Sequence, residues 1–490
     1  MTEGLLVIEL MLPLAAAFLV LLTGGRKLPC DLLPLPFAFL SPVLGLGLVS
    51  KLKAGEEIKT ELIRVLPDLG LSFNLDALGA VFLLLTSSLW AVISLYSLGY
   101  MRSLQEHALR RFYCCFSLAI FGAFGVAMAQ NLLTLFVFYE ILTVSTFPLV
   151  AHEESEEALR AGRKYLVYLL SGATVGLFGL LWLKQKGGTL DFSVGGNIAG
   201  KIDPRMWGIL FLLLAFGFGT KAAVMPFHEW LPSAMIAPTP VSALLHAVAV
   251  VKAGVFSCIR VILCVFGPKT LGSFGSDSVF AFAVAFTVIG ANLLALSEDH
   301  LKRRLAFSTV NNLAVIILGA MLPTESGIKG AMIHIPFHGL MKITLFMCAG
   351  AIFVKTKKEY VNELSGLGKR MPITFGAFAV ASLGLTGIPP ICGFWSKWYL
   401  CSGALEAKNV AFLLVFLASS FLDAAYFLPI VYKAFFEGPG SQKVDEAPWT
   451  LTLPLIITAL TCLLLGLFPD FLFGFLQFAE KASSAALMGG

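Results

Sequence analysis

Long apolar segments separated by short polar stretches recur along almost the whole chain. About fourteen of them run for roughly 18 to 25 residues, the length that an α-helix needs to cross the ~30 Å hydrocarbon core of a bilayer. Only the polar segment from Lys51 to Asp76 is predicted to be a long loop. The pattern predicts an all-α polytopic membrane protein with helices centred near Leu14, Gly45, Leu84, Ile120, Val144, Gly176, Ala215, Val251, Ala285, Ala314, Leu345, Phe378 (continuing near Tyr399), Phe416 and Ala459.

The amino-acid composition agrees with lipid as the solvent. Hydrophobic residues make up 58% of the chain and charged residues 13%, and the charged share is about half that of a soluble domain. The net charge of +5 is small and its basic residues are spread over many loops, which argues against nucleic acid as a partner. The N-terminus has no basic region before the apolar stretch that ends at Val20, so we interpret this stretch as the first span and not as a cleaved signal peptide.

The cysteines and glycines carry no cofactor motif. Nine cysteines are scattered singly apart from Cys114 and Cys115, without CxxC or any metal-ligand spacing. Neither GxGxxG in a βαβ context nor a P-loop lysine occurs. We therefore expect no cofactor and no metal site, and the energy for any transport has to come from a partner subunit or an ion gradient.

Lysine and arginine are concentrated in alternate loops. Loops after odd-numbered helices hold more of them than loops after even-numbered helices, as the positive-inside rule expects of cytoplasmic loops. Both termini are then predicted to face outward from the cell membrane. The basic residues of the odd-numbered loops are Arg26, Lys27, Arg102, Arg110, Arg111, Arg160, Arg163, Lys164, Lys302, Arg303, Arg304, Lys355, Lys357, Lys358, Lys369 and Arg370.

Two segments in the middle of the chain are alike. "GTKAAVMPFHEWLP" (Gly219–Pro232) and "LTGIPPICGFWSK" (Leu385–Lys397) are each an apolar helix interrupted by proline, with aromatic residues and a charge nearby. Each falls late in a series of five spans, and tandem copies of an odd number of spans enter the membrane from opposite sides. The pattern predicts two inverted five-helix repeats with broken helices 7 and 12, in which Lys221 and Lys397 are not equivalent positions.

These repeats divide the chain into four parts. Residues 1–111 hold helices 1 to 3, and residues 112–266 hold the first inverted repeat, helices 4 to 8. Residues 267–436 hold the second repeat, helices 9 to 13, and residues 437–490 hold helix 14 and a short amphipathic tail from Pro469.

Several ionisable residues lie inside the predicted spans, where each costs at least about 2.5–3.5 kcal/mol to insert. His334, His338 and Lys342 have the spacing i, i+4, i+8, which places them on one helix face about 6 Å apart per step. This spacing suits proton transfer with one water between steps. The candidate site residues are Glu140, Lys221, His246, Lys252, His334, His338, Lys342 and Lys397.

Each of these side chains has a simpler interpretation on its own. The amine of Lys397 could extend to the membrane surface, and His246 could be a packing residue, whereas the short stem of Glu140 cannot reach far out of a span. Proline breaks at Pro226 and at Pro389 with Pro390 free carbonyl groups that are tolerated only beside water or protein. We therefore expect the nearby lysines, Lys221 and Lys397, to lie beside hydrated pockets.

The segments "FVFYEILTVSTFPLV", "GTKAAVMPFHEWLPSAMIAPTPVSALLHAVAVVKAG", "HIPFHGLMKITLF" and "LSGLGKRMPITFGAFAVASLGLTGIPPICGFWSKWYL" carry a family resemblance. They resemble the antiporter-like membrane subunits shared by multisubunit Na+/H+ (Mrp) antiporters, respiratory complex I and membrane-bound hydrogenases. The resemblance runs over nearly the whole chain, and "GIPPICGFWSKWYL" is most similar to the D-type Mrp protein and its hydrogenase relatives.

The resemblance implies fourteen helices and a central axis of charged residues. It implies Glu140 and Lys221 as the paired charges of the first half and Lys252 with His246 as the link. It further implies a central relay and a distal lysine. One relative carries glutamate at the position of this lysine. The relay comprises His334, His338 and Lys342, and the distal lysine is Lys397.

The implied mechanism makes Lys221 a switch, because burial favours loss of a lysine proton and an approaching carboxylate such as Glu140 favours its retention. Moving one proton against ~150 mV costs about 3.5 kcal/mol, which a pKa change of roughly 2.5 units supplies. The predicted function is that of a proton-translocating or Na+/H+-exchanging subunit, most similar to the D-type Mrp protein. Its expected partners are other membrane subunits, a redox module, H+, Na+ and lipid.

Other functions stay open. The main alternative is a non-redox, ion-pumping subunit of a membrane-bound hydrogenase or complex I-type oxidoreductase. A stand-alone solute transporter predicts activity from this chain alone. A structural subunit predicts that changes to the charged axis leave activity intact.

Overall fold

The computed structural model describes residues 2–22, 29–66, 69–438, 444–471 and 473–489. Within these residues, eleven helical spans are long and apolar enough to cross a membrane. They are α1 (Thr2–Leu22), α2 (Pro34–Lys53), α3 (Ala77–Leu104), α4 (Leu109–Met128), α5 (Leu132–Val150), α6 (Glu156–Gln185), the composite span Thr239–Phe266, α11 (Ser276–Ser297), α13 (Glu325–Thr356), α16 (Val410–Phe436) and α17 (Trp449–Leu467).

Three further helices complete the set of predicted spans. Two are shorter and apolar, α7 (Pro204–Gly219) and α14 (Pro372–Thr386), and the third is the more polar α12 (Leu301–Ala320). Each centre expected from the sequence lies inside one of these helices, so the predicted polytopic all-helical fold is confirmed.

The remaining elements are short. The composite span comprises α9 (Thr239–Ala243), the π-helical segment η2 (Leu244–Val248), α10 (Val250–Arg260) and the π-helical segment η3 (Val261–Phe266). The others are α8 (Trp230–Ser233), η1 (Ala234–Ile236), η4 (Val361–Glu363), η5 (Leu367–Lys369), α15 (Gly393–Glu406) and α18 (Phe475–Met488).

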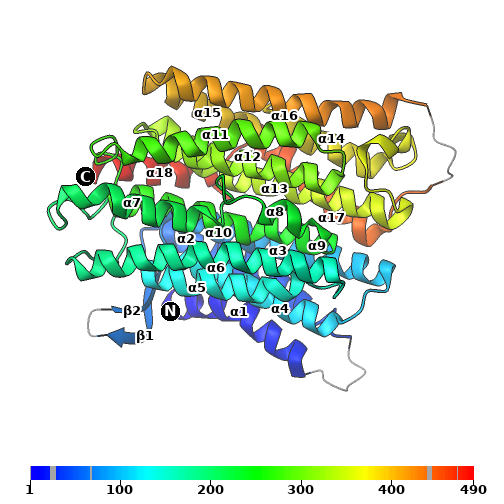
Figure 1. Cartoon of the computed structure of the whole chain (residues 1–490). Helices are drawn as coiled ribbons and strands as arrows, with labels where there is room; N and C mark the ends of the chain where they lie inside the picture. The colour runs from blue at the N-terminus through cyan, green and yellow to red at the C-terminus, as the bar shows by residue number, and fades with distance from the viewer. Residues whose placement is uncertain (1, 23–28, 67–68, 439–443, 472, 490) are drawn as a thin grey trace.

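The long helices run side by side in one general direction, and the two termini lie at the same end of the molecule (Figure 1). The central helix α13 has 32 residues, and 89% of its apolar window is buried inside the protein. The outlying helix α16 has only 28% of its window buried. The part of the polar axis that lies on α13 is therefore well shielded inside the bundle.

The segment from Lys51 to Asp76 is not the plain loop that the sequence suggested. Strand β1 (Lys59–Leu66) pairs antiparallel with β2 (Leu69–Asn74), with Lys59 opposite Asn74. The search for long apolar stretches misses such a hairpin, because its strands are short and partly polar. Of the basic loop residues, Arg26 and Lys27 lie outside the described residues.

The two predicted helix breaks are present. Helix α7 ends at Gly219 and α8 begins at Trp230, while α14 ends at Thr386 and α15 begins at Gly393. At the second break α15 starts so close to α14 that a Cβ on Gly393 would lie 1.9 Å from the carbonyl oxygen of Gly384. The inverted relation of the two halves and the four-part division stay predictions.

A buried ion pair ties the start of α3 to the end of α10. Arg260 is 1% exposed, and its Nη1 and Nη2 donate to the two carboxylate oxygens of Asp76 at 2.5 and 2.7 Å. Asp76 also caps α3, because its Oδ1 accepts from the backbone N–H of Gly79 at 2.8 Å. One carboxylate therefore holds a helix start and neutralises a buried guanidinium.

Asp76→Ala is expected to destabilise the folded chain by about 3 kcal/mol, because it leaves the Arg260 charge buried and unpaired. The measurement is the melting temperature of the purified protein in detergent. Asp203→Ala is the matched control, because Asp203 also caps a helix, accepting from the Arg205 N–H at 3.0 Å, but its ion pair with the Arg205 side chain at 3.9 Å is exposed and contributes little. Equal melting temperatures for the two variants would contradict the role of the buried pair.

Candidate functional site

Lys221 lies in the break that follows α7, and its side chain is fully buried. Its Nζ donates to the carbonyl oxygen of Tyr139 at 2.5 Å and to the hydroxyl of Thr143 at 2.8 Å, both on α5. The ammonium also lies over the Tyr139 ring, 3.3 Å from the ring centroid. Its charge is therefore held by dipoles and an aromatic face.

Glu140 reaches Lys221 only through an intervening residue. The Thr143 hydroxyl, which accepts from Lys221, lies 3.2 Å from Oε1 of Glu140 and can donate to it. No direct ion pair joins Glu140 and Lys221 among the described residues. The pairing implied by the family resemblance is thus indirect, with one hydroxyl group between the two charges.

Lys252 on α10 and His338 on α13 form the link to the centre of the axis. Lys252 Nζ lies 2.5 Å from His338 Nδ1, and both side chains are fully buried. His246 lies in the π-helical segment η2, and its ring packs on Phe346 with centroids 4.6 Å apart. Neither of its ring nitrogens has a hydrogen-bond partner among the described residues, so His246 is not joined to Lys252 by a direct hydrogen bond.

The histidines of α13 share one helix face, as their spacing predicted. The His334 and His338 rings are stacked with centroids 5.8 Å apart. Their polar contacts nevertheless point to other helices: His334 Nδ1 lies 2.7 Å from the Ser396 hydroxyl, and Nε2 lies 3.1 Å from Oδ1 of Asn312. Lys342 Nζ donates to the Leu305 carbonyl oxygen at 3.2 Å.

Lys397 on α15 forms a direct ion pair within the axis. Its Nζ donates to Oδ2 of Asp423 on α16 at 2.9 Å, and the two side chains are 10% and 0% exposed. The lysine is therefore turned inward to a carboxylate, and the interpretation in which its amine extends to the membrane surface is wrong.

Asp423 is a site residue that the sequence reasoning missed. Its other oxygen, Oδ1, accepts from the Tyr426 hydroxyl and from Nδ2 of Asn311 at 3.3 Å. The Tyr426 hydroxyl also lies 3.1 Å from Oδ1 of Asn292 on α11. The signal was present, because an aspartate inside the apolar run "ASSFLDAAYFL" carries the same insertion cost that singled out Glu140.

Glu9 on α1 is a second buried carboxylate that was missed. It is fully buried and its Oε1 accepts from the Ser41 hydroxyl of α2 at 2.6 Å, while Oε2 has no partner among the described residues. Glu9 lies outside the series that connects Glu140 with Asp423.

Taken together, titratable side chains from α10, α13, α15 and α16 and from the break after α7 form a buried polar series across the bundle, and the partly buried Glu140 of α5 lies at its start. Three contacts anchor it: Lys221 with Thr143, Lys252 with His338, and Lys397 with Asp423. Such a series can pass protons between neighbouring bases when water fills the intervals, since each amine, imidazole and carboxylate both binds and releases a proton.

Comparison with known families identifies the chain. Residues 129–423 match the family described as NADH:quinone oxidoreductase/Mrp antiporter, transmembrane. Residues 67–113 match the N-terminal family of NADH-ubiquinone oxidoreductase (complex I) chain 5.

Individual relatives cover most of the chain. It is 29% identical over 424 residues to NADH-quinone oxidoreductase subunit N of Desulforudis audaxviator, covering 82% of this chain and 83% of the relative. It is 30% identical to hydrogenase-4 component B of Escherichia coli, covering 81% of this chain. It is also 30% identical to Na(+)/H(+) antiporter subunit A1 of Staphylococcus haemolyticus, covering 96% of this chain. The chain spans 62% of the length of each of the last two proteins.

The fold is similar to chains of solved membrane complexes. The TM-score is 0.86 at 22% identity with a chain of the Mrp complex from Dietzia, covering 99% of this chain and 97% of that one. It is 0.84 at 24% identity with a chain of respiratory complex I from Thermus thermophilus, covering 99% and 100%. The chain therefore is a multi-pass membrane protein and belongs to the family of antiporter-like membrane subunits found in NADH:quinone oxidoreductases and Mrp antiporters.

Proposed function

We propose that this chain is an ion-translocating subunit of a multisubunit membrane complex and that it moves protons along the buried polar axis. The observation that carries the proposal is the series of buried titratable side chains, anchored by the Lys221–Thr143, Lys252–His338 and Lys397–Asp423 contacts. A structural subunit has no need for so many buried charges, each of which is costly to insert.

The proposed cycle begins at Lys221. While Tyr139 and Thr143 hold the ammonium, Lys221 keeps its proton, and the negative charge of Glu140 supports this state through the Thr143 hydroxyl. When movement of α5 or of a neighbouring protein pulls these groups away, the amine is left in apolar surroundings and releases its proton. The proton passes through water to Lys252 and His338, and from there to the distal pair.

Lys397 and Asp423 form the distal proton site in this scheme. A proton that arrives at this pair can be stored as an ammonium facing a carboxylate, and loss of a proton from Lys397 leaves the negative charge of Asp423 compensated only by hydrogen bonds. The Tyr426 and Asn311 donors supply these bonds, so that the carboxylate stays solvated by protein through the cycle.

The orientation is part of the proposal. Both termini lie at one end of the bundle (Figure 1). The loops that follow the odd-numbered members of the fourteen predicted spans hold the excess of Lys and Arg, and they connect helices at the other end. The positive-inside rule assigns that other end to the cytoplasm, so both termini face outward from the cell membrane.

The proposed complex is an Mrp-type antiporter in which this chain has the role of the D-type protein, as the wording of Gly387–Leu400 favours. The alternative is an ion-pumping oxidoreductase, because relatives include hydrogenase-4 component B and NADH-quinone oxidoreductase subunit N. The test is transport by the assembled complex in vesicles. Na+-dependent proton exchange without a redox substrate supports the antiporter, and proton uptake that requires redox turnover supports the alternative.

Thr143→Val is expected to lower proton transport at least about tenfold while the complex still assembles, because a hydrogen bond to a charged group contributes about 1.5–3 kcal/mol. The substitution removes the hydroxyl between Lys221 and Glu140 and nearly keeps the shape. Thr146→Val is the matched control on the same helix, since the Thr146 hydroxyl contacts Tyr165 and the Leu142 carbonyl oxygen. Wild-type transport in the Thr143→Val complex would rule out the bridge.

Lys397→Arg is expected to abolish or severely slow transport, because a guanidinium pairs with Asp423 but does not release its proton. Lys397→Met is expected to abolish transport as well. Lys397→Glu alone should fail, since it faces one carboxylate with another, whereas Lys397→Glu combined with Asp423→Asn restores a single titratable group and should retain partial transport. Full activity of the arginine variant would exclude Lys397 as a proton carrier.

The Lys397–Asp423 pair is also expected to couple strongly in stability. Lys397→Met and Asp423→Asn each leave the opposite group without its partner and should each cost about 3–5 kcal/mol, while the double variant should recover most of this loss. The measurement is a double-mutant cycle on melting in detergent. The control cycle uses Lys329 and Glu480, whose side chains are 13% and 48% exposed, and should give a coupling below about 1 kcal/mol.

A further inference from the structure

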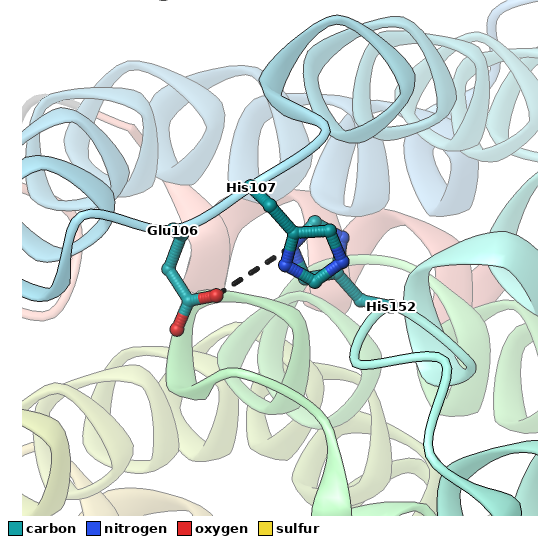
Figure 2. Close-up of side chains that lie close together, drawn as sticks. All are labelled: Glu106, His107 and His152. Atoms are coloured by element: carbon teal, nitrogen blue, oxygen red, sulfur yellow. Dashed lines mark ion pairs between the residues drawn. The ribbon is translucent and has the colours of Figure 1, made fainter.

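A cluster of metal-binding side chains lies outside the polar axis, at the end of the bundle opposite the termini. Glu106 and His107 lie in the turn between α3 and α4, and His152 follows the end of α5 (Figure 2). The turn is closed on both sides by left-handed residues, Gln105 with φ 54° and Ala108 with φ 50°. The backbone therefore fixes where Glu106 and His107 stand.

The three side chains lie close together (Figure 2). His152 Nε2 lies 3.8 Å from Oε2 of Glu106, and the His107 and His152 rings are stacked with centroids 4.8 Å apart. One ligand atom from each of the three residues lies within 4.8 Å of the other two. The 3.8 Å between His152 Nε2 and Glu106 Oε2 is too long for a hydrogen bond.

His152 is the buried member of the cluster. It is 0% exposed, and neither of its ring nitrogens has a hydrogen-bond partner among the described residues. Burial lowers the pKa of His152 to about 4, with the neighbouring His107 and Arg111 acting in the same direction. In the neutral form of the ring one nitrogen carries a lone pair that can bind a cation, while the other carries a proton.

The surrounding charges are compatible with a cation. Arg111 is the nearest permanent positive charge, but it pairs with Glu154 and donates to the His152 carbonyl oxygen at 2.9 Å. Glu153 adds negative charge near Glu106, and Lys357 is the opposing positive group. The carboxylates thus offset the basic side chains around the cluster.

We propose that Glu106, His107 and His152 bind a divalent cation of the Zn2+ class, with water in the remaining position. Two imidazoles and one carboxylate are a ligand set that Zn2+ accepts, whereas Ca2+ and Mg2+ prefer oxygen ligands only. Zn2+ bonds of ~2.0–2.1 Å place tetrahedral ligand atoms about 3.3 Å apart. The ligand atoms must therefore move closer together when the cation binds. His107, which is exposed, and Glu106, which is half-buried, are the residues that move.

The bound cation connects two parts of the chain that the sequence keeps apart. His152 stands 45 residues after His107, which is why ligand spacing in the sequence predicted no metal site. The site joins the α3–α4 turn to the end of α5, the helix that also carries Thr143 and Glu140. Binding of the cation therefore fixes the position of the C-terminal end of α5.

The test is Zn2+ binding by the full-length chain, purified in detergent without a polyhistidine tag and treated with a chelator. Titration against a competing chromophoric chelator is expected to show one Zn2+ per chain, and saturating Zn2+ is expected to raise the melting temperature. His107→Gln and Glu106→Gln should each weaken the affinity by about tenfold or more and abolish the melting shift. His107 is exposed and Glu106 is only half-buried, so these variants test the site even if His152→Gln does not fold.

The matched control is His300→Gln. His300 Nε2 lies 3.9 Å from Oε1 of Glu359 in a similar histidine–carboxylate pair, but the described residues offer it no third ligand. Zn2+ affinity should be unchanged in this variant. Absence of stoichiometric binding by the wild-type chain, or equal losses in His107→Gln and His300→Gln, would overturn the proposal.

Discussion

A charge inside a lipid bilayer has to be solvated by the protein itself, and the arrangement of this bundle depends on that constraint. Each buried cation finds its partner on a different segment of the chain. Lys397 meets the carboxylate of Asp423, Arg260 meets Asp76, and Lys252 meets the imidazole of His338. Helix packing is therefore also charge solvation, and moving one helix against another changes the environment of a titratable group.

The two halves of the axis solvate their lysines in different ways. Lys221 is held by the Tyr139 carbonyl oxygen, the Thr143 hydroxyl and the Tyr139 ring. The Glu140 carboxylate contacts this hydroxyl and not the ammonium itself. Lys397 instead faces a carboxylate directly. A direct ion pair stabilises an ammonium more strongly than neutral dipoles do, so the two halves of the axis differ in how they hold a positive charge.

The sequence predicted the parts of this structure that follow from local pattern. Apolar length located the spans, prolines located the breaks near Pro226 and Pro390, and i, i+4 spacing placed His334 and His338 on one face. Contacts between distant segments were beyond such reasoning. Thr143 is an ordinary helix residue in the sequence, and only the fold places its hydroxyl between Lys221 and Glu140.

Other omissions had a readable signal. Asp423 and Glu9 are carboxylates in apolar runs, and the insertion-cost argument applied to them as well as to Glu140. The β1–β2 hairpin was hidden because a search for membrane-length segments does not weigh short strands. The family resemblance grouped His246 with Lys252, but His246 lies in the π-helical turn Leu244–Val248 and its ring packs on Phe346.

The position of Asp423 on α16 has a mechanical meaning. One face of this helix is among the most exposed surfaces of the bundle, with Phe421 and Tyr432 at 74% and 62% exposure, while Asp423 on the inner face is tied to α12 and α15. The outer side of α16 is therefore open to a neighbouring protein, while its inner side carries one member of an ion pair. A shift of α16 by about an ångström away from α15 would lengthen this 2.9 Å contact beyond hydrogen-bond range and would leave both charges without their partner.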